Sequence, residues 1–232
     1  MEIYALKLNN SLSDSLFAQL LTITSSAKRK RINRFVNQSH AEPTLMADVL
    51  LRFLLARKLH IALEDIYFQY NQYGKPFLRD RENIHFNVSH SGNWIVCGID
   101  HVPIGVDIEQ VRPIDEGVAK RFFSTNEYVW LQSKAEADRV HYFYLIWTMK
   151  ESILKNIGIG LSRATDSFSI QLKEGQYYST LDQNLQFKQY NIDPAYVTSV
   201  CSKNKEFPPY VQVVEIDELL QKVIRCNKGM WS

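Results

Sequence analysis

Three short apolar segments follow one another at the middle of the chain, and they limit the possible folds more than any other feature. Only a few residues separate them, and the segments are Ile84–Val88, Trp94–Ile99 and Ile104–Glu109. Connections this short are typical of an antiparallel meander, in which strands adjacent in sequence are also adjacent in space. The centre of the chain therefore predicts a small antiparallel sheet.

A long helix is predicted on each side of this meander. Apolar residues keep helical spacing over residues 38–59 and again over 138–156, and Gly158 is a natural stop for the second helix. Shorter helices are predicted over 13–21, 124–131 and 215–225, and further strands over 2–8, 66–70, 168–172, 177–181, 185–190, 196–201 and 210–214. Helices with a short antiparallel sheet in each half give an α+β fold. The expected boundary near 101–105 divides the chain into halves 1–104 and 105–232.

The composition is that of an ordinary globular protein. The chain has 27 basic and 25 acidic residues, so its formal charge is only +2, which argues against a globally basic nucleic-acid coat. No apolar run approaches the roughly 18 residues that span a bilayer, and the N-terminus lacks the layout of a signal peptide. Three widely spaced cysteines suit a reducing compartment. We therefore expect a cytoplasmic protein without a membrane partner.

Two acids in the third segment of the meander are candidates for metal binding. Asp107 and Glu109 lie in G-V-D-I-E at 105–109. Because side chains alternate along a strand, these carboxylates share one face while Val106 and Ile108 share the other. Carboxylate oxygens suit Mg²⁺, which completes its shell with water and substrate phosphate. The alternative is a half-exposed strand with two solvated acids.

The second long helix presents a further acid and a lysine. Trp147, Glu151 and Lys155 are spaced four residues apart, so they lie on one helical face. Glu151 can supply a third carboxylate to the ion, and Lys155 can hold a phosphate. The alternative is a surface Glu–Lys pair, and Trp147 is expected in the core.

A second group of residues can hold phosphate. Ser89 and His90 lie in F-N-V-S-H-S-G at 86–92, where hydroxyls, an imidazole and turn amides suit a phosphate cradle. The alternative for this segment is a plain hairpin turn. Lys28 and Arg31 lie in a basic run that can grip phosphate, and its alternatives are a solvated helix face or a nucleic-acid patch. The near-neutral total charge argues against extended nucleic-acid tracking.

Two shorter signals complete the set. In G-K-P at 74–76, Lys75 can reach a phosphate, while Gly74 and Pro76 can shape a loop against a flat base. Glu127 completes an S-x-x-E capping box with Ser124. It is therefore either a helix cap or a base.

The order of these motifs resembles one enzyme family. The chain carries G-K-P at 74–76, F-N-V-S-H-S at 86–91, G-V-D-I-E at 105–109, F-F-S-T-N-E at 122–127 and W-T-M-K-E-S-I-L-K at 147–155. This series resembles the 4′-phosphopantetheinyl transferases of the long, single-chain, surfactin-synthetase-activating (Sfp) type, over nearly the whole chain. From the residues alone, two other classes stay open: another Mg-dependent enzyme that cleaves a pyrophosphate, and a nucleic-acid-binding module using Lys28–Arg34.

The resemblance implies a fold and a site. The fold is two similar halves with pseudo-twofold symmetry, each a short, mainly antiparallel sheet packed with a long helix, and coenzyme A binds between them. The metal, Mg²⁺ with Mn²⁺ as a substitute, is expected on Asp107, Glu109 and Glu151. Contacts to coenzyme A are expected from Lys28, Arg31, Thr44, Gly74, Lys75, Pro76, Ser89, His90 and Lys155.

The sequence departs from the family pattern at two positions. Pro43 precedes Thr44 where many relatives carry a basic residue, and Arg31 stands where close relatives have Lys. Both departures bear on binding of the 3′-phosphate of coenzyme A.

The resemblance also implies a reaction. A serine hydroxyl of a peptidyl or acyl carrier domain attacks the phosphorus next to the pantetheine arm of coenzyme A, and 3′,5′-ADP leaves. The long form usually serves non-ribosomal peptide synthetases, hence antibiotic and lipopeptide biosynthesis. We expect Glu151 to act as base with Lys155 beside the phosphates, and Glu127 is the rival base.

Carrier docking is predicted on residues 111–123. This segment follows the two acids directly and sets apolar residues among basic ones, a surface that suits an acidic carrier domain. The expected contacts are Val111, Val118, Phe122 and Phe123. We expect a monomer, because two fused halves can form an internal site.

Overall fold

The computed structural model describes residues 1–226, and its N-terminal half is built on a four-stranded sheet. The strand order is β11-β1-β5-β4, with β1 at Glu2–Lys7, β4 at His85–Ser91, β5 at Trp94–Asp100 and β11 at Gln212–Val214. Strand β5 is antiparallel to both β1 and β4, whereas β11 is parallel to β1. The sheet therefore joins the two ends of the described chain.

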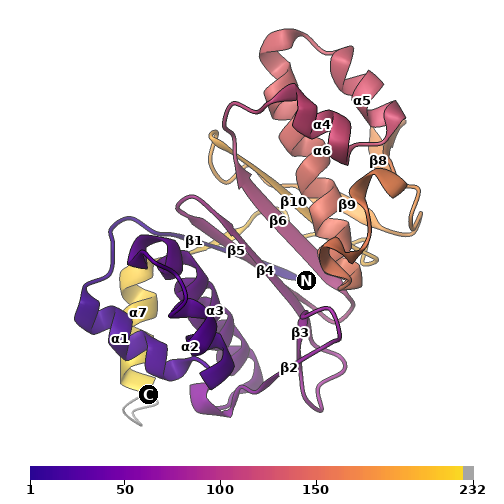
Figure 1. The fold of residues 1–232 in the computed structure, drawn as a ribbon. Helices are drawn as coiled ribbons and strands as arrows, with labels where there is room; N and C mark the ends of the chain where they lie inside the picture. Colours follow the sequence, from indigo (N-terminus) through magenta and orange to yellow (C-terminus); the bar gives the residue numbers. More distant parts are fainter. Residues whose placement is uncertain (227–232) are drawn as a thin grey trace.

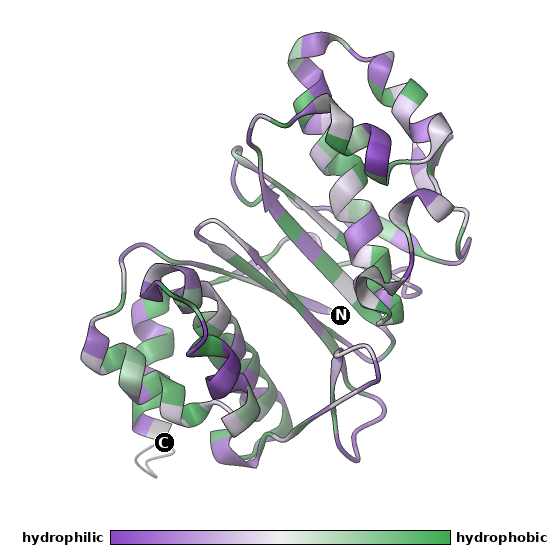
Figure 2. Ribbon diagram, viewed as in Figure 1, coloured by the Kyte–Doolittle hydropathy of each residue, from purple (hydrophilic) through white to green (hydrophobic). Residues whose placement is uncertain are grey.

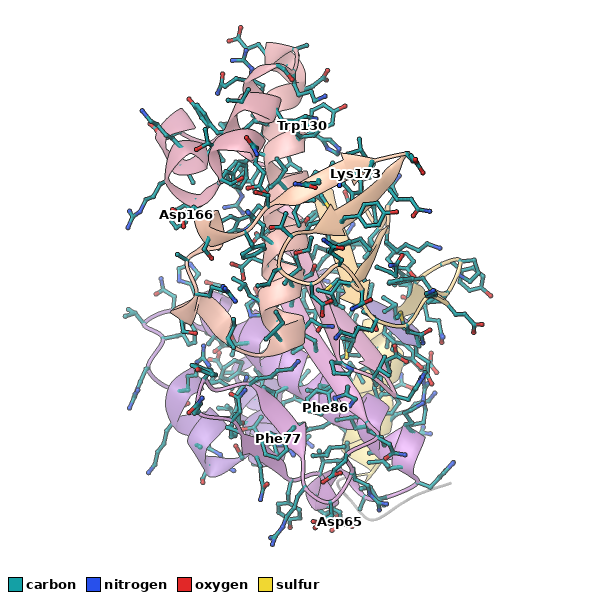
Figure 3. The ribbon with its side chains drawn as sticks, turned by 90° about the vertical axis from the view of Figure 1, so that its right-hand side faces the viewer. Asp65, Phe77, Phe86, Trp130, Asp166 and Lys173 are labelled. Carbon is teal, nitrogen blue, oxygen red and sulfur yellow. The ribbon has the colours of Figure 1, made fainter. Side chains whose placement is uncertain are left out.

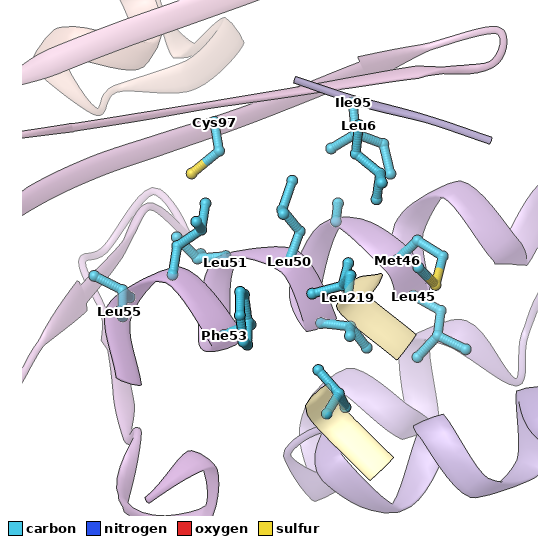
Figure 4. Packing of buried hydrophobic residues seen from close by; sticks show 14 of the residues in the cluster. Leu6, Leu45, Met46, Leu50, Leu51, Phe53, Leu55, Ile95, Cys97 and Leu219 are labelled. Carbon is cyan, nitrogen blue, oxygen red and sulfur yellow. The ribbon is translucent and has the colours of Figure 1, made fainter. Parts of the chain in front are cut away.

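Four helices cover one face of this sheet (Figure 1). They are α1 (Asp14–Ile23), α2 (Ser26–Ile32), α3 (Gln38–Leu59) and α7 (Ile216–Cys226). Helix α3 is buried on nearly every side between Ala41 and Ala56, because it lies between the sheet and the other helices. Figure 4 shows Leu50 and Leu51 of α3 facing Ile95 and Cys97 of β5, with Leu219 of α7 close by.

The C-terminal half repeats this plan with a smaller sheet. The strand order is β6-β10-β9, all antiparallel, with β6 at Ile104–Gln110, β9 at Gln186–Gln189 and β10 at Tyr196–Ser202. Helix α6 (Glu136–Ile157) packs along it and has 22 residues, as α3 does. Figure 2 shows hydrophobic and hydrophilic residues interleaved along the helices and strands, as expected of elements with one buried side.

Shorter elements flank the two sheets. Helices α4 (Glu116–Phe122) and α5 (Thr125–Gln132) lie beside the N-terminal part of α6 (Figure 1). Strands β2 (Phe68–Tyr70) and β3 (Pro76–Leu78) form one hairpin, and β7 (Ile170–Lys173) and β8 (Gln176–Ser179) form another. One-turn helices η1 (Leu63–Asp65), η2 (Gly160–Ser162) and η3 (Thr165–Ser167) complete the chain as described.

The two halves meet through an apolar interface between their sheets. Ala5 and Val96 of the first sheet pack with Val106 and Ile108 of the second. On the other side of β6, Gly105 lies directly against α6, where a Cβ atom at this position would be only 1.8 Å from the Ser152 carbonyl oxygen. The absence of a side chain at Gly105 therefore lets helix and strand come into contact.

The predicted α+β fold is confirmed, and most expected elements form. The meander prediction is correct for β4 and β5 but wrong for β6, which pairs with β10 instead. Strand β6 leaves the first sheet because its apolar side chains Ile104, Val106 and Ile108 pack face to face against β1 and β5. The basic run forms α2, capped by Ser25, and β3 was not predicted.

The last two described elements, β11 and α7, pack with the N-terminal half. Strand β11 joins the first sheet, and Leu219 and Val223 of α7 are buried in the N-terminal core. The segment 212–226 therefore lies with the N-terminal half in space, although it falls in the predicted half 105–232. The division at 104/105 otherwise stays a prediction, and residues 227–232 lie outside the described residues. Among residues 1–226, no helix is both long and apolar enough to cross a membrane.

Candidate active site

The two acids of β6 point to the same side of the strand, toward α6. Asp107 is 2% exposed although it carries a carboxylate. Its Oδ1 accepts hydrogen bonds from Lys155 Nζ at 2.5 Å and from Ser89 Oγ at 2.8 Å. Lys155 Nζ also donates to Ser89 Oγ at 2.8 Å. One residue from each of β4, β6 and α6 thus meets at a single point.

Glu109 is held in a similar way two residues further along β6. Its Oε2 accepts a hydrogen bond from Ser91 Oγ at 2.7 Å, and Trp147 of α6 lies within hydrogen-bonding reach of the same carboxylate. Burial and the neighbouring charge of Asp107 raise the pKa of Glu109. The carboxylate is therefore fixed in direction but crowded by negative charge.

Glu151 adds a third carboxylate from α6. Burial raises its pKa from 4.5 to about 7, and the charges of Asp107 and Glu109 act in the same direction. Within the described chain, two carboxylate oxygens here are buried without any hydrogen-bond partner: Asp107 Oδ2 and Glu151 Oε1. Buried acceptors without a donor are costly, so this cluster fits an additional cation.

The fit requires side-chain movement. Across residues 1–226, no three Asp, Glu, His or Cys side chains are arranged as a ready metal cage. The ammonium of Lys155 lies 2.5 Å from Asp107 Oδ1, the place that a metal would share with this carboxylate. The donor set is hard oxygen, as Mg²⁺ and Mn²⁺ require. The orphaned oxygens support a metal here once Lys155 and Glu151 readjust.

Two basic side chains of the N-terminal half, Lys28 and Arg31, lie near His90, which follows Ser89 on β4. Burial lowers the pKa of His90, and the charges of Lys155, Lys28 and Arg31 act in the same direction. Burial likewise lowers the pKa of Lys28, while Asp48 opposes this effect. These side chains come from α2, β4 and α6, and together they favour an anionic ligand.

The predicted site residue Thr44 lies on α3. Thr44 is 8% exposed and lies one turn before Asp48, whose charge acts on Lys28. Pro43 stands inside α3, within the first two turns. Thr44 therefore lies on the side of α3 that faces the basic helix, but the structure gives it no polar contact with the other predicted residues.

The G-K-P loop lies against the C-terminal end of α6. Gly74 has φ of +86°, a conformation that favours glycine, and its amide donates to the Asn71 carbonyl. Lys75 Nζ donates to the Asn156 carbonyl oxygen at 2.8 Å. In the structure as described, Lys75 thus binds the end of α6 rather than a position next to Lys28.

A cavity of about 250 Å³ lies beside this loop. Figure 3 shows two of its aromatic residues, Phe77 and Phe86, in the lower half of the view. The lining also includes Lys75, Pro76, His85, Pro103 and Asn156. Its apolar walls and its place between the hairpin and α6 suit a flat ring.

Glu127 has a different environment from the three acids. It is buried, and its Oε2 is 2.7 Å from Lys150 Nζ in an ion pair whose side chains are 2% and 0% exposed. Its carboxylate also accepts hydrogen bonds from the amides of Ser124 and Ile170. The expected capping box is present. These contacts favour the cap over the base, because the carboxylate oxygens are already occupied.

The predicted docking segment is only partly accessible. Phe123 is 3% exposed and belongs to a small core with Phe143, so its prediction as a docking residue is wrong. Val118 and Phe122 are half-buried against the same core, and Val111 against another. They keep a surface that a partner can contact.

Sequence reasoning missed several residues that border this site. Asn87 and Ser91 flank Ser89 on the same face of β4 and bond to β6, and their alternation in F-N-V-S-H-S was the available signal. Trp147 was assigned to the core, and it does pack edge-on against Phe122, with ring centroids 5.4 Å apart, but it also reaches Glu109. Lys150 gave no signal, because nothing in the sequence marks it as buried.

Comparisons with known proteins agree with the resemblance. A family model described as "4'-phosphopantetheinyl transferase superfamily" matches residues 103–201, and one described as "4'-phosphopantetheinyl transferase, N-terminal" matches residues 11–100. The 4'-phosphopantetheinyl transferase Sfp of Bacillus subtilis is 39% identical over 95% of this chain and 100% of that protein. The transferase gsp of Aneurinibacillus migulanus is 37% identical over 87% of this chain and 86% of that protein.

A solved structure is a more distant match. The holo-[acyl-carrier-protein] synthase of Thermotoga maritima aligns with a TM-score of 0.38 and 17% identity, over 43% of this chain and 61% of that chain. The sequence relatives are decisive by themselves, since these two are at least 37% identical over most of both chains. The chain belongs to the 4′-phosphopantetheinyl transferase family.

Proposed function

We propose that this enzyme transfers the 4′-phosphopantetheine arm of coenzyme A to a serine hydroxyl of peptidyl or acyl carrier domains and so converts apo carriers to holo carriers. The observation that carries this proposal is that Lys155 contacts Asp107 in a group of three crowded carboxylates, while its charge also acts on His90, which lies near Lys28 and Arg31. Such a pairing suits a ligand that combines a phosphate-rich nucleotide with a divalent cation. Non-ribosomal peptide synthetases are the expected source of the carrier.

The phosphates of coenzyme A are assigned to the positive side chains. Lys155 is assigned to the pyrophosphate because it lies beside the acids, with Ser89 next to it. Lys28 and Arg31 on α2 are further candidates for the pyrophosphate or the 3′-phosphate. The cavity at Lys75 and Pro76 is assigned to the adenine ring because of its apolar walls.

A divalent ion, Mg²⁺ or Mn²⁺, would be held by Asp107, Glu109 and Glu151. It would neutralise charge on the pyrophosphate, which otherwise repels an incoming oxyanion. The unpaired oxygens Asp107 Oδ2 and Glu151 Oε1 support this assignment.

In the reaction, the serine oxygen forms a bond to the phosphorus next to the pantetheine arm, and the bond from that phosphorus to the 3′,5′-ADP oxygen breaks. The serine proton must leave as this happens, because a neutral hydroxyl is a weak nucleophile. We assign its removal to Glu151, which lies on a rigid helix beside the other acids. A Glu151→Gln protein that kept both metal binding and full turnover would overturn this assignment.

The acceptor is expected to dock on the surface of α4 beside the acids. Val118 and Phe122 leave part of their side chains exposed there, next to Lys120 and Arg121 of the same helix. A basic rim around an apolar patch suits an acidic carrier. The monomeric state and the cytoplasmic location stay predictions, and the buried free thiols of Cys97 and Cys201 accord with the latter.

One experiment tests the proposal directly. A purified carrier domain is incubated with coenzyme A, Mg²⁺ and the enzyme, and intact mass spectrometry follows the gain of one phosphopantetheine group. Peptidyl and acyl carriers are run side by side, and a carrier whose acceptor serine is alanine serves as control. No mass gain on any carrier, with release of 3′,5′-ADP into water instead, would favour a pyrophosphate-cleaving enzyme.

A further inference from the structure

Within residues 1–226, the strand that carries the acids has one edge without a backbone partner strand. Strand β6 pairs with β10 along its other edge only. On the free edge, side chains of β4 take up the backbone amides: Val106 N donates to Asn87 Oδ1 at 2.9 Å, and Gln110 N donates to Ser91 Oγ at 3.1 Å. At this edge, hydrogen bonds to side chains therefore replace the backbone hydrogen bonds that pair strands elsewhere.

These contacts form a side-chain seam, which we define as Asn87, Ser89 and Ser91 of β4. Alternate residues of a strand share one face, so all three reach toward β6. Their partners follow in the same order along β6, which means that the two strands run parallel. Figure 1 shows β4 and β6 side by side where the two halves meet. A parallel backbone ladder would place the two strands about 4.8 Å apart. Here the side chains of the seam lie between β4 and β6 instead.

The members of the seam differ in what they hold. Asn87 binds only the backbone of β6. Ser89 binds Asp107 but also Lys155, which is assigned to the phosphates. Ser91 binds a backbone amide and the Glu109 carboxylate, at 2.7 Å from Oε2. Ser91 is therefore the member whose contacts concern one acid alone.

The geometry of Ser91 fixes its hydroxyl proton. A serine hydroxyl has one proton and two lone pairs. Because the Gln110 amide donates into a lone pair of Ser91 Oγ, the Ser91 proton is directed away from that amide and onto Glu109 Oε2. We propose that Ser91 is a positioning residue that holds the Glu109 carboxylate in the direction required for the divalent ion. This inference rests on the proposed function, since it assigns Ser91 to the ion that the acids would hold.

The test measures metal binding without turnover. Mn²⁺ is titrated into the full-length enzyme with coenzyme A present and no carrier, and free Mn²⁺ is followed by electron paramagnetic resonance. Loss of a hydrogen bond that orients a metal ligand typically weakens affinity by roughly 10- to 100-fold. We expect Ser91→Ala to weaken Mn²⁺ binding by about tenfold or more. Ser91→Thr keeps the hydroxyl and is expected to retain most of the affinity.

Asn87→Ala is the matched control, because it removes a bond of the same seam that touches no acid. We expect it to lower the melting temperature and to leave Mn²⁺ affinity unchanged. The inference is overturned if Ser91→Ala binds Mn²⁺ like the wild type, if Ser91→Thr is as weak as Ser91→Ala, or if Asn87→Ala weakens binding equally. Should Ser91→Ala not fold, Ser91→Cys replaces it, with the same weakening expected because a thiol is a weak donor. A wild-type enzyme that neither binds Mn²⁺ with coenzyme A nor modifies a carrier would instead overturn the proposed function.

Discussion

The buried ion pair between Glu127 and Lys150 allows the two roles of Glu127 to be separated. Glu127→Gln keeps the capping box, which accepts glutamine at this position as well as glutamate, but it removes the negative charge. Lys150 then has an ammonium that is 0% exposed and has lost its ion-pair partner, although the charge of Asp166 still acts on it and the Phe168 carbonyl oxygen at 2.5 Å still accepts from it. Removing one partner of such a pair costs about 3–5 kcal/mol.

The expected result is a large loss of stability with little loss of chemistry. For a chain of this size each kcal/mol lowers the melting temperature by about 2–4 °C, so the expected fall is roughly 6–20 °C. Circular dichroism during heating and urea unfolding measure it. Carrier modification is then assayed at a temperature where the variant is fully folded, and its turnover number should be close to that of the wild type.

Two further variants make this reasoning testable. Glu136→Gln makes the same change at the first turn of α6, where the side chain is exposed, and should cost less than about 0.5 kcal/mol. The double variant Glu127→Gln with Lys150→Met leaves no buried charge at these two positions and should recover part of the lost stability. The reasoning is refuted if Glu127→Gln unfolds within about 1 kcal/mol of the wild type while its turnover collapses. Glu127 would then be catalytic.

Three other predictions follow from single contacts. Gly105→Ala places a Cβ atom 1.8 Å from the Ser152 carbonyl oxygen, so it should cost about 3 kcal/mol or more in urea unfolding; a melting temperature equal to that of the wild type would show that α6 can shift freely. Burial lowers the pKa of Lys75 from 10.5 to about 8, so between these pH values the unfolded chain holds a proton that the folded chain has lost. Wild-type stability should therefore rise relative to Lys75→Met across that window and be level below it, and unfolding free energies that differ equally at pH 7 and pH 10 would contradict this. Val118→Glu should raise the carrier KM by roughly tenfold or more, about 1.4 kcal/mol, and leave coenzyme A affinity in calorimetry unchanged; Val129→Glu, at a valine 62% exposed on α5, is its control, and a fall in coenzyme A affinity would show that Val118 is structural.

The regular elements could be predicted because local pattern determines them. The long helices and the alternation of Asp107 and Glu109 with Val106 and Ile108 are local properties, and the structure has them where expected. The partner of β6 is not a local property. It depends on the single apolar face of β6, which packs against β1 and β5, and on β10, which lies about 90 residues further along. Short connections favoured the wrong neighbour, because they carry no information about such distant strands.

The candidate site, too, could be predicted only in part from local sequence. Residue types and spacing identified the acidic and basic residues of interest. They did not show that Glu127 forms an ion pair with Lys150, or that Lys75 binds the end of α6. Both facts depend on burial, which arises from the packing of segments remote in sequence. Asn87 and Ser91 are the opposite case, because their alternation with Ser89 is visible in the sequence. That they bond to the backbone of β6 could be seen only in the structure, where this edge of β6 lies next to β4.

The charges of the site explain why it lies between the halves rather than within one of them. The carboxylates of Asp107, Glu109 and Glu151 come from β6 and α6, and burial together with the charges of the first two raises the pKa of Glu151. The side chains of Lys28, Arg31 and His90 come from α2 and β4, and burial, then the charges of Lys155 and the two basic side chains of α2, lower the pKa of His90. Each set is unfavourable by itself, and the contact of Lys155 with Asp107 offsets only part of this. A pyrophosphate carrying a divalent ion would satisfy both sets at once, and neither half alone presents the two sets together. The proposed binding of coenzyme A therefore depends on the junction of β4 with β6 more than on either sheet.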